Sequence, residues 1–588
     1  MKQFLIMSVS SALLLSAQML ITNAAFAEVT CEQWAGKAVK VQGDVMVRRS
    51  STGEESPLRL NDVLCPGDMI TVSKHGRAGI QLPARTLAQL DQGTSLIFTE
   101  PEKAEFSLIN ILRGIVHFMS RTPQTLEVKT PFVNAGVEGT EFVISVLGTE
   151  TLLTVFEGTI RAHNDLGPMI IEKGQSARAR TGEPPEPYTV ARPRDSVRWA
   201  LYYLPLYDLS EADIPDEGAP WQSALRESVS HFREGDLSKA FMSLDPIQES
   251  VPDHRFYLYR ASLLLAVGRV DEAEEDLSRV LGMREENSDA LALQSVIAVA
   301  QNDKEQAMSL AGRAAAADPR STTAQMAMSY VLQSKLDLKG ALMSSKNAVA
   351  FEPENSLAWA RLAEMHQSFG ELDRALEAAE KAAALNPRLS RTQTVLGYSY
   401  LTQVKTGDAR DAFEQAIVLD QADPLPWMGL GLAKIREGKL EEGRSDLEVA
   451  AVLDPGNSLA RSYLGKAYYE EKEEDFAGDQ YAMARELDPK DPTPFFYDAI
   501  RKQSMNRPVE ALKDMQKAIA LNDNRAIYRS KLLLDEDLAA RSAAQARIYS
   551  DLGFQQLALV EGWKSVNTDP GNYAAHRFLA DSYSKLPR

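Results

Sequence analysis

The chain has 588 residues, of which 44% are hydrophobic and 25% are charged; this ordinary composition excludes a chain that is disordered throughout. Its formal net charge of −18 argues against general binding to nucleic acids or anionic membranes, because such binding needs basic patches that neutralise phosphates. The length allows about three to five ordinary domains, or fewer where a repeat array grows by stacking.

The first 27 residues predict a secretory signal peptide. A positive start at Lys2 precedes an apolar run over residues 4–21, and Ala25 and Ala27 place small residues where a signal peptidase cleaves. We expect Glu28 to be the first mature residue; the alternative is an uncleaved transmembrane anchor, because the apolar run is long. No later stretch has the roughly 18 consecutive apolar residues of a spanning helix, so a periplasmic or bacterial cell-envelope location is expected for the mature chain.

Residues 31–180 have the pattern of an all-β domain. Short runs of alternating apolar and polar residues are interrupted by glycines, and this two-residue period is typical of strands that are buried on one face. The clearest runs cover residues 39–47, 78–82, 142–146 and 153–160.

Both cysteines of the chain, Cys31 and Cys65, fall within this β domain. In an exported protein such a pair predicts one disulfide, because the compartment is oxidising. The alternative is two free thiols buried in the domain.

Residues 181–220 are predicted to be a linker. The Gly-Glu-Pro-Pro-Glu-Pro run at 182–187 cannot continue a helix or a central strand, because proline lacks the backbone N–H group. Residues 197–205 are Val-Arg-Trp-Ala-Leu-Tyr-Tyr-Leu-Pro, which is too aromatic for a solvated tether. We expect this segment to dock on the open end of the following domain; the alternative is that it binds a partner.

Residues 221–588 have a helical pattern that repeats every 34 residues. A small residue recurs seven times at this spacing, and a proline-containing turn ends most units. Helical hairpins of this kind cannot bury their apolar faces alone, so neighbouring units must stack into an all-α solenoid. The recurring residues are Ala314, Ala348, Ala382, Ala416, Ala450, Ala484 and Ala518.

This unit resembles the tetratricopeptide repeat (TPR), whose first helix carries a Trp, Leu, Gly and Tyr pattern and whose second carries alanine and an aromatic residue. The resemblance implies about ten repeats plus a terminal half-repeat, and an array that binds proteins without specifying which ones. The residues that carry it are Trp427, Leu430 and Gly431 in one unit, Leu464, Gly465 and Tyr468 in the next, and Leu396, Gly397, Tyr400, Ala409, Phe413 and Ala416 in another.

The β domain resembles the FecR domain, the periplasmic part of iron-responsive regulators. The resemblance implies a β-rich, solenoid-like module that senses or binds proteins. A FecR-type signalling protein also carries a cytoplasmic anti-sigma segment and one spanning helix before this domain, and this chain begins instead with a predicted signal peptide. The matching segments are Cys65-Pro66-Gly67-Asp68, Leu112-Arg113-Gly114-Ile115-Val116, Thr130-Pro131, Gly139-Thr140-Glu141-Phe142-Val143 and Val155-Phe156-Glu157-Gly158.

The sequence contains no catalytic or metal-binding motif. No two of the seven histidines lie three or four residues apart, and no nucleophile elbow, phosphate loop or dinucleotide fingerprint occurs. Glu138 and Glu141 flank a predicted turn, and we assign them a structural role. The acidic run at residues 470–475 is expected to be a solvated corner, with a docking patch for a basic partner as the alternative. We therefore expect no enzymatic activity, no cofactor and no metal.

The resemblance to TPR proteins also implies a protein-binding groove, because set positions on each first helix face the inside of the superhelix. Aromatic, methionine and charged side chains at these positions are typical contact residues, and the alternative is that many of them pack against the adjacent unit. One lysine and no asparagine argue against a clamp for a C-terminal carboxylate. The candidate residues are Tyr330, Glu364, Tyr398, Met428, Lys466, Tyr469 and Phe496.

Residues 573–584 begin another first helix, and no second helix follows it. A stacked array normally closes with a polar capping helix, because an open end exposes apolar surface. We expect Phe578, Leu579 and Tyr583 to be covered by another protein, by another copy or by further polypeptide.

These features favour an exported envelope scaffold or adaptor that binds proteins, such as outer-membrane or export-system components, through the TPR groove. The first alternative is a FecR-type sensor or regulator that lacks the cytoplasmic anti-sigma segment. The second is the targeting arm of a cell-wall or export assembly system.

Overall fold

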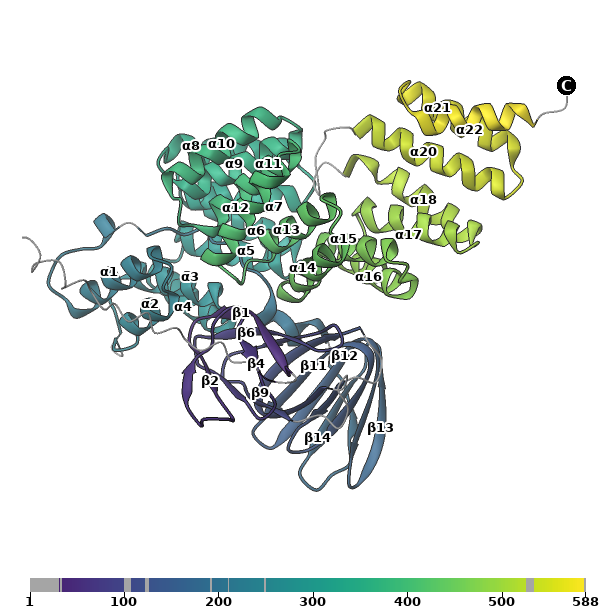
Figure 1. Cartoon of the computed structure of the whole chain (residues 1–588). Coiled ribbons are helices and arrows are strands. Elements are labelled where there is room, and N and C mark those ends of the chain that lie inside the picture. Colours follow the sequence, from purple (N-terminus) through teal and green to yellow (C-terminus); the bar gives the residue numbers. More distant parts are fainter. Residues whose placement is uncertain are drawn as a thin grey trace, which may run out of the picture.

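The computed structural model describes residues 31, 34–99, 107–121, 126–190, 193–209, 211–247, 250–524 and 534–585. A β-rich domain lies beneath a curved array of paired helices (Figure 1). This arrangement confirms the predicted fold class, an N-terminal all-β domain followed by an all-α solenoid. The predicted signal peptide at residues 1–27 and its cleavage site lie outside the described residues.

The strands of the N-terminal domain join into one hydrogen-bonded sheet. Its main path runs β15-β14-β12-β11-β10-β9-β7-β6-β1-β4, and the remaining strands branch from it. The strands are β1 (Gly36–Gln42), β2 (Val45–Arg48), β3 (Glu55–Pro57), β4 (Val63–Leu64), β5 (Met69–Val72), β6 (Arg77–Leu82), β7 (Thr86–Leu90), β8 (Ser95–Thr99), β9 (Ser107–Ser120), β10 (Leu126–Lys129), β11 (Asn134–Leu147), β12 (Glu150–Asn164), β13 (Gly167–Glu172), β14 (Ser176–Arg180) and β15 (Glu186–Tyr188).

The long strand β9 connects two parts of this sheet. Its first half pairs with β8 and β10, and its second half pairs with β7 and β11. The change of neighbours falls at Gly114, whose φ of +99° suits glycine, and a Cβ there would lie 2.4 Å from the Cα of Thr94. Phe118 and Phe142 stack with their ring centroids 5.0 Å apart and both are 0% exposed, so the second half of β9 contributes to a packed core.

A disulfide joins Cys31 to Cys65, with the two Cα atoms 5.8 Å apart and 34 positions apart in the sequence. It ties the start of the described chain to the turn after β4. We predict that reducing it lowers the free energy of unfolding by about 3–4 kcal/mol, because the bond restricts the unfolded chain. Urea denaturation with and without reductant measures this difference. Two freely alkylated cysteines in the protein purified without reductant would contradict the bond itself.

Two short 3-10 helices, η1 (Pro193–Ala200) and η2 (Glu211–Asp213), lead from the β domain into the solenoid. The solenoid helices pair in sequence order, and most first helices start 34 residues after the previous one. They are α1 (Pro220–Arg233), α2 (Leu237–Leu244), α3 (His254–Ala266), α4 (Val270–Met283), α5 (Ser288–Ala300), α6 (Lys304–Ala317), α7 (Thr322–Ser334), α8 (Leu338–Phe351), α9 (Ser356–Phe369), α10 (Leu372–Leu385), α11 (Ser390–Thr402), α12 (Thr406–Leu419), α13 (Pro424–Arg436), α14 (Leu440–Leu453), α15 (Ser458–Glu470), α16 (Glu474–Leu487), α17 (Pro492–Ser504), α18 (Pro508–Ala520), η3 (Asn522–Asn524), α20 (Leu534–Asp551), α21 (Gln555–Thr568) and α22 (Tyr573–Ser584).

The recurring alanines mark the places where helices approach most closely, and all seven are 0% exposed. We predict that Ala416→Leu lowers the free energy of unfolding by about 1–3 kcal/mol, because extra methyl groups have no room there. Val418→Leu is the matched control, since Val418 on the same helix is 72% exposed. Thermal or urea denaturation compares the two, and equal effects would contradict tight packing at Ala416.

The array coils tightly enough for units far apart in the sequence to touch. The side chain of Asn302, between α5 and α6, donates a hydrogen bond to the carbonyl oxygen of Leu487 at 3.2 Å. Lys304 lies beside it, 3.7 Å from the carboxylate of Asp488. These contacts join the third helical pair to the end of α16 and the loop that follows it. They therefore stabilise the superhelix by linking units that are far apart in the sequence.

The terminal half-unit, α22, differs from the expectation that its apolar side chains need a covering partner. Phe578 and Leu579 of α22 are only 8% and 6% exposed, and they belong to one apolar cluster with residues of α20 and α21. The expected open apolar end is therefore wrong at these two positions. Tyr583 is 47% exposed, and its hydroxyl accepts a hydrogen bond from the indole N–H of Trp563 at 2.8 Å.

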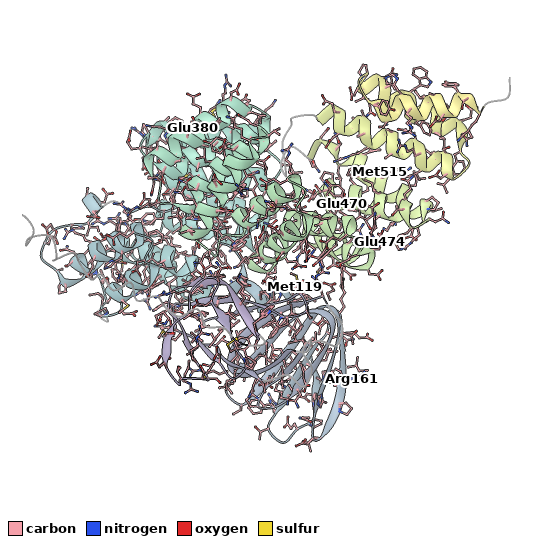
Figure 2. The ribbon with its side chains drawn as sticks, viewed as in Figure 1. Met119, Arg161, Glu380, Glu470, Glu474 and Met515 are labelled. Carbon is pink, nitrogen blue, oxygen red and sulfur yellow. A yellow bond between two sulfur atoms is a disulfide. The ribbon has the colours of Figure 1, made fainter. Side chains whose placement is uncertain are left out.

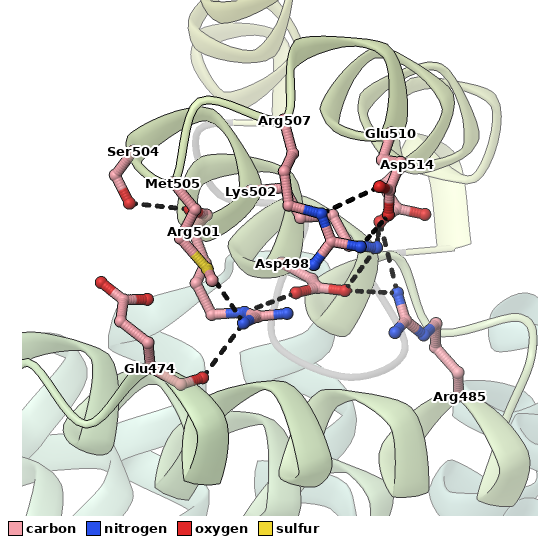
Figure 3. A network of polar contacts seen from close by, with 10 residues as sticks. All are labelled: Glu474, Arg485, Asp498, Arg501, Lys502, Ser504, Met505, Arg507, Glu510 and Asp514. Carbon is pink, nitrogen blue, oxygen red and sulfur yellow. Dashed lines mark hydrogen bonds and ion pairs between the residues drawn. The ribbon is translucent and has the colours of Figure 1, made fainter.

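A polar network connects three successive helices near the far end of the array (Figure 3). The buried carboxylate of Asp498 on α17 lies 2.9 Å from Arg485 on α16, 2.8 Å from Arg501 and 2.9 Å from Lys502. Lys502 also reaches Asp514 on α18 at 2.5 Å. The network therefore contributes charge pairs where neighbouring units would otherwise meet only through apolar contacts.

Candidate protein-binding groove

The segment after the β domain is held by both parts of the protein. Val197, Trp199 and Ala200 of η1 pack in one apolar cluster with Val143 of the β domain. Beyond Ala200 the chain has no helix or strand up to residue 209. In this stretch Tyr203, Leu206 and Leu209 are 2–4% exposed and share an apolar cluster with the first units of the solenoid.

The β domain, the segment and the solenoid meet at one point. Arg77 of β6 donates one hydrogen bond to the carbonyl of Trp199 at 2.7 Å and another to the carbonyl of Ala266, the last residue of α3, at 2.8 Å. Gln42 of β1 also donates to Ala266, at 2.9 Å. Gly268 is required in the next turn, because its φ is +72° and a Cβ would lie 2.1 Å from the Trp199 carbonyl oxygen.

Tyr202 projects toward the first helices of the middle units. Burial raises the pKa of Tyr202 well above its usual value, and the negative charges of Asp423 and Asp420 add to the shift. Burial also raises the pKa of Asp423 to about 7, although Arg391 opposes that shift. Asp423 caps α13 by accepting a hydrogen bond from the backbone N–H of Leu425 at 2.9 Å. The Tyr202 side chain therefore lies near a buried carboxyl that caps the start of α13.

Two of the residues predicted for the groove, Tyr330 and Glu364, join this site. Arg391 on α11 pairs with the carboxylate of Glu364 and lies 3.2 Å from the Tyr330 hydroxyl. Arg361 on α9 lies over the Tyr330 ring at 3.8 Å and 2.8 Å from Glu364. The two arginines and the two predicted residues thus form one polar cluster on neighbouring first helices.

Neither Arg361 nor Arg391 was predicted as a groove residue from the sequence, although comparison of the 34-residue repeats marks both positions as unusual. One period away, Arg391 aligns with Leu357 and Leu425, and Arg361 aligns with Ala327 and Val395. Each arginine therefore interrupts a column of apolar residues. A charge in such a column has to find a partner inside the array, because an unpaired buried charge is costly.

The other predicted residues lie farther along the array or inside it. The Tyr398 hydroxyl donates to the carbonyl of Leu425 at 2.8 Å, and Met428 is 5% exposed within the packed core of α14 to α16. The Lys466 amine lies 5.5 Å from the centre of the Tyr497 ring. Tyr469 is half-buried, and Phe496 packs under Arg541 at 5.3 Å. No residue of the predicted set is fully exposed.

The β domain docks on α14, α15 and α16 through buried charges. The two terminal nitrogens of the Arg461 guanidinium on α15 each donate to one carboxylate oxygen of Glu141 on β11 at 2.6 Å, and both side chains are at most 2% exposed. His117 of β9 lies 3.2 Å from the same carboxylate. Figure 2 labels Met119 at this junction, where it joins the apolar core of the three helices. Glu141 therefore has a structural role, but it lies within β11 next to a shift in strand register and not at the predicted turn.

The acidic run at residues 470–475 is only partly a solvated corner. Glu473 pairs with Arg85 of the β domain, with a second contact between the two side chains at 2.9 Å. Glu471 lies 2.7 Å from Arg444. At Glu473 the run therefore contacts a basic residue of this chain's own β domain, and the alternative of a docking patch for a basic partner stays a prediction.

An open hollow of about 450 Å³ remains beside the docked segment. It is lined by the segment itself, by β1 and by the first helices α3, α5, α9 and α11. Lining residues include Gln42, Tyr202, Leu293, Leu357, Arg391 and Asp420. The docked segment therefore leaves part of this surface uncovered.

Within the residues that the structure describes, no three His, Cys, Asp or Glu side chains gather as a metal site would require. Among the same residues, no helix combines the length and apolar character needed to cross a bilayer.

Comparisons with known proteins agree with this architecture. A family model described as FecR protein matches residues 68–161, and a tetratricopeptide repeat model matches residues 258–322, 361–425, 394–458 and 428–492. The chain therefore carries a FecR domain followed by a TPR array. None of the curated proteins compared with the chain matches it.

Several solved structures resemble the solenoid. The Cut9–Hcn1 hetero-tetramer of APC/C is 15% identical, with 63% of this chain and 85% of that chain covered and a TM-score of 0.40. YrrB, described as a TPR protein with an unusual peptide-binding site, is 22% identical, with 32% and 97% covered and a TM-score of 0.24. PilF of Pseudomonas aeruginosa is 20% identical, with 37% and 98% covered and a TM-score of 0.28.

Proposed function

We propose that this protein is an exported scaffold or adaptor of the bacterial cell envelope that binds protein partners through the inner surface of its TPR array. The observation that carries the proposal is the groove itself. Its first helices present tyrosines and paired charges, and they already hold an extended segment of polypeptide at residues 201–209. Side chains of this kind supply both specificity and contact area in protein interfaces.

The proposal predicts that a single charge in the groove matters for partner capture. Glu364→Gln removes the negative charge that pairs with Arg361 and Arg391 while keeping the side-chain shape. The matched control is Glu380→Gln, since Glu380 is exposed on the outside of the array (Figure 2). Cross-linking in intact cells, followed by affinity capture of the full chain, is expected to recover partners with wild type and the control but several-fold less with Glu364→Gln.

Two outcomes would count against this function. Equal capture of partners by Glu364→Gln and Glu380→Gln would show that the binding surface lies outside the groove. Recovery of the full chain in the cytoplasmic fraction, with residues 1–27 still attached, would contradict export. The mass of the mature N-terminus decides the second point, because cleavage before Glu28 gives a single defined product.

A FecR-type sensor or regulator is the second candidate. The observation that favours it is the FecR match at residues 68–161, together with the docking of that domain against α14, α15 and α16. A signal received by the β domain would then reach the TPR array through a shared, buried interface. Partner capture that changes when Arg85 or Arg461 is replaced would support this candidate over a passive scaffold.

A further inference from the structure

This inference deepens the proposed function and rests on it. We propose that residues 201–207 occupy the site of an external ligand, and that this ligand is an extended polypeptide segment with a tyrosine flanked by leucines. The segment inside the chain is then a built-in competitor that a partner's segment displaces.

The first support is the way in which the segment is held. Residues 202–207 form neither helix nor strand, and side chains provide their described contacts with the solenoid; farther on, the Leu209 carbonyl accepts a hydrogen bond from Arg233 of α1 at 3.1 Å. Leu201 packs on the turn between α14 and α15, where a Cβ on Gly456 would lie 3.0 Å from its methyl group. Tyr203 and Leu206 enter the apolar cluster of the first units. A segment bound through side chains can be replaced by another that carries the same side chains.

The second support is the pocket for the Tyr202 hydroxyl. Asp423 is 0% exposed; its Oδ1 accepts the backbone N–H of Leu425, while its buried Oδ2 has no hydrogen-bond partner among the described residues, so a tyrosine hydroxyl beside it can supply a donor that an apolar ring cannot. The site therefore favours tyrosine over phenylalanine. Arg391, which faces both Asp423 and the Glu364–Tyr330 pair, connects this pocket to the rest of the groove.

The third support is the tethering of the segment. On one side it continues directly from η1, which packs on the β domain, and on the other side the exposed residues 216–218 lead to α1. These tethers keep its effective concentration near the groove at about the millimolar level, so an external segment competes poorly until the internal one is weakened. The hollow beside the segment is lined by the groove helices and gives an incoming chain a place to bind first.

A labelled peptide with the sequence of residues 197–209 tests the proposal by fluorescence anisotropy with the full chain. We expect Tyr202→Ala in the chain to bind this peptide at least about tenfold more tightly than wild type does, because its own segment competes less well. Tyr573→Ala is the matched control, since Tyr573 is 76% exposed at the far end of the array. A peptide carrying Y202F is expected to bind the Tyr202→Ala chain about tenfold more weakly than the original peptide.

Hydrogen exchange on the wild-type chain gives an independent measurement that does not depend on a variant folding. A millimolar excess of the peptide is expected to speed amide exchange at residues 201–209 and to leave α20 and α21 unchanged. Equal peptide affinity for wild type and Tyr202→Ala, together with unchanged exchange at 201–209, would overturn the inference. The proposed function is judged separately by the Glu364→Gln capture experiment, so either idea can fail alone.

Discussion

Arg461→Ala is expected to lower the free energy of unfolding by about 3–5 kcal/mol, because it leaves the Glu141 carboxylate buried without its main cation. Burial alone would raise the pKa of Glu141, but Arg461 and then His117 outweigh it and hold that pKa well below its usual value. The contribution of this pair is therefore fully present above the unfolded pKa of about 4.3 and is lost as pH falls through the folded value.

Urea denaturation of the full chain at neutral and acidic pH measures this effect. Lys173→Ala is the matched control, because the Lys173–Glu486 pair also joins the β domain to the solenoid but is about half exposed on both sides. Its effect is expected to stay within about 1 kcal/mol. A loss for Arg461→Ala no larger than that of the control would mean that the buried pair does not hold the two parts together.

Asp498→Ala is expected to cost about 3–5 kcal/mol as well, because it leaves Arg485, Arg501 and Lys502 without the carboxylate they share. Burial would raise the pKa of Asp498, but Lys502 and the two arginines outweigh it and lower that pKa. The stabilisation is therefore present above the unfolded pKa of about 3.9 and disappears as pH falls through the folded value.

Glu510→Ala provides the control for this second prediction. Glu510 and Arg507 form an exposed pair at 2.5 Å in the same region (Figure 3), and its loss is expected to change the free energy of unfolding by less than about 1 kcal/mol. A denaturation series from about pH 7 to pH 3 should show the Asp498→Ala difference shrinking in acid. A difference that is independent of pH would show that the carboxylate charge is not its source.

The sequence alone determined the repeat register and the class of both parts. Helix starts such as His254, Ser288 and Thr322 follow from the 34-residue period, because caps, small residues and turns recur within each unit and act locally. Alternating residues in the first third likewise specified strands, since a two-residue period places one face of a strand in the core. These features depend on neighbours close in the chain.

The periodic patterns of the sequence did not show which elements the buried faces of the helices and strands pack against. Residues 181–220 were predicted to be a linker with an aromatic docking segment, but the sequence did not show that Tyr203 and Leu206 of this segment belong to the core of the solenoid. Among the groove residues, Tyr330 and Glu364 meet at one site, while Met428 is part of the packed interior.

Only the tertiary structure decided how the FecR domain, the segment and the solenoid fit together. Arg461 and Glu141 are separated by 320 positions, and Arg77 reaches Trp199 and Ala266 from a different domain. The periodicity of a sequence reports which side chains are buried, because burial repeats with the element. It does not report their partners, because a contact between distant elements depends on how the superhelix coils and on which surfaces it then brings within reach.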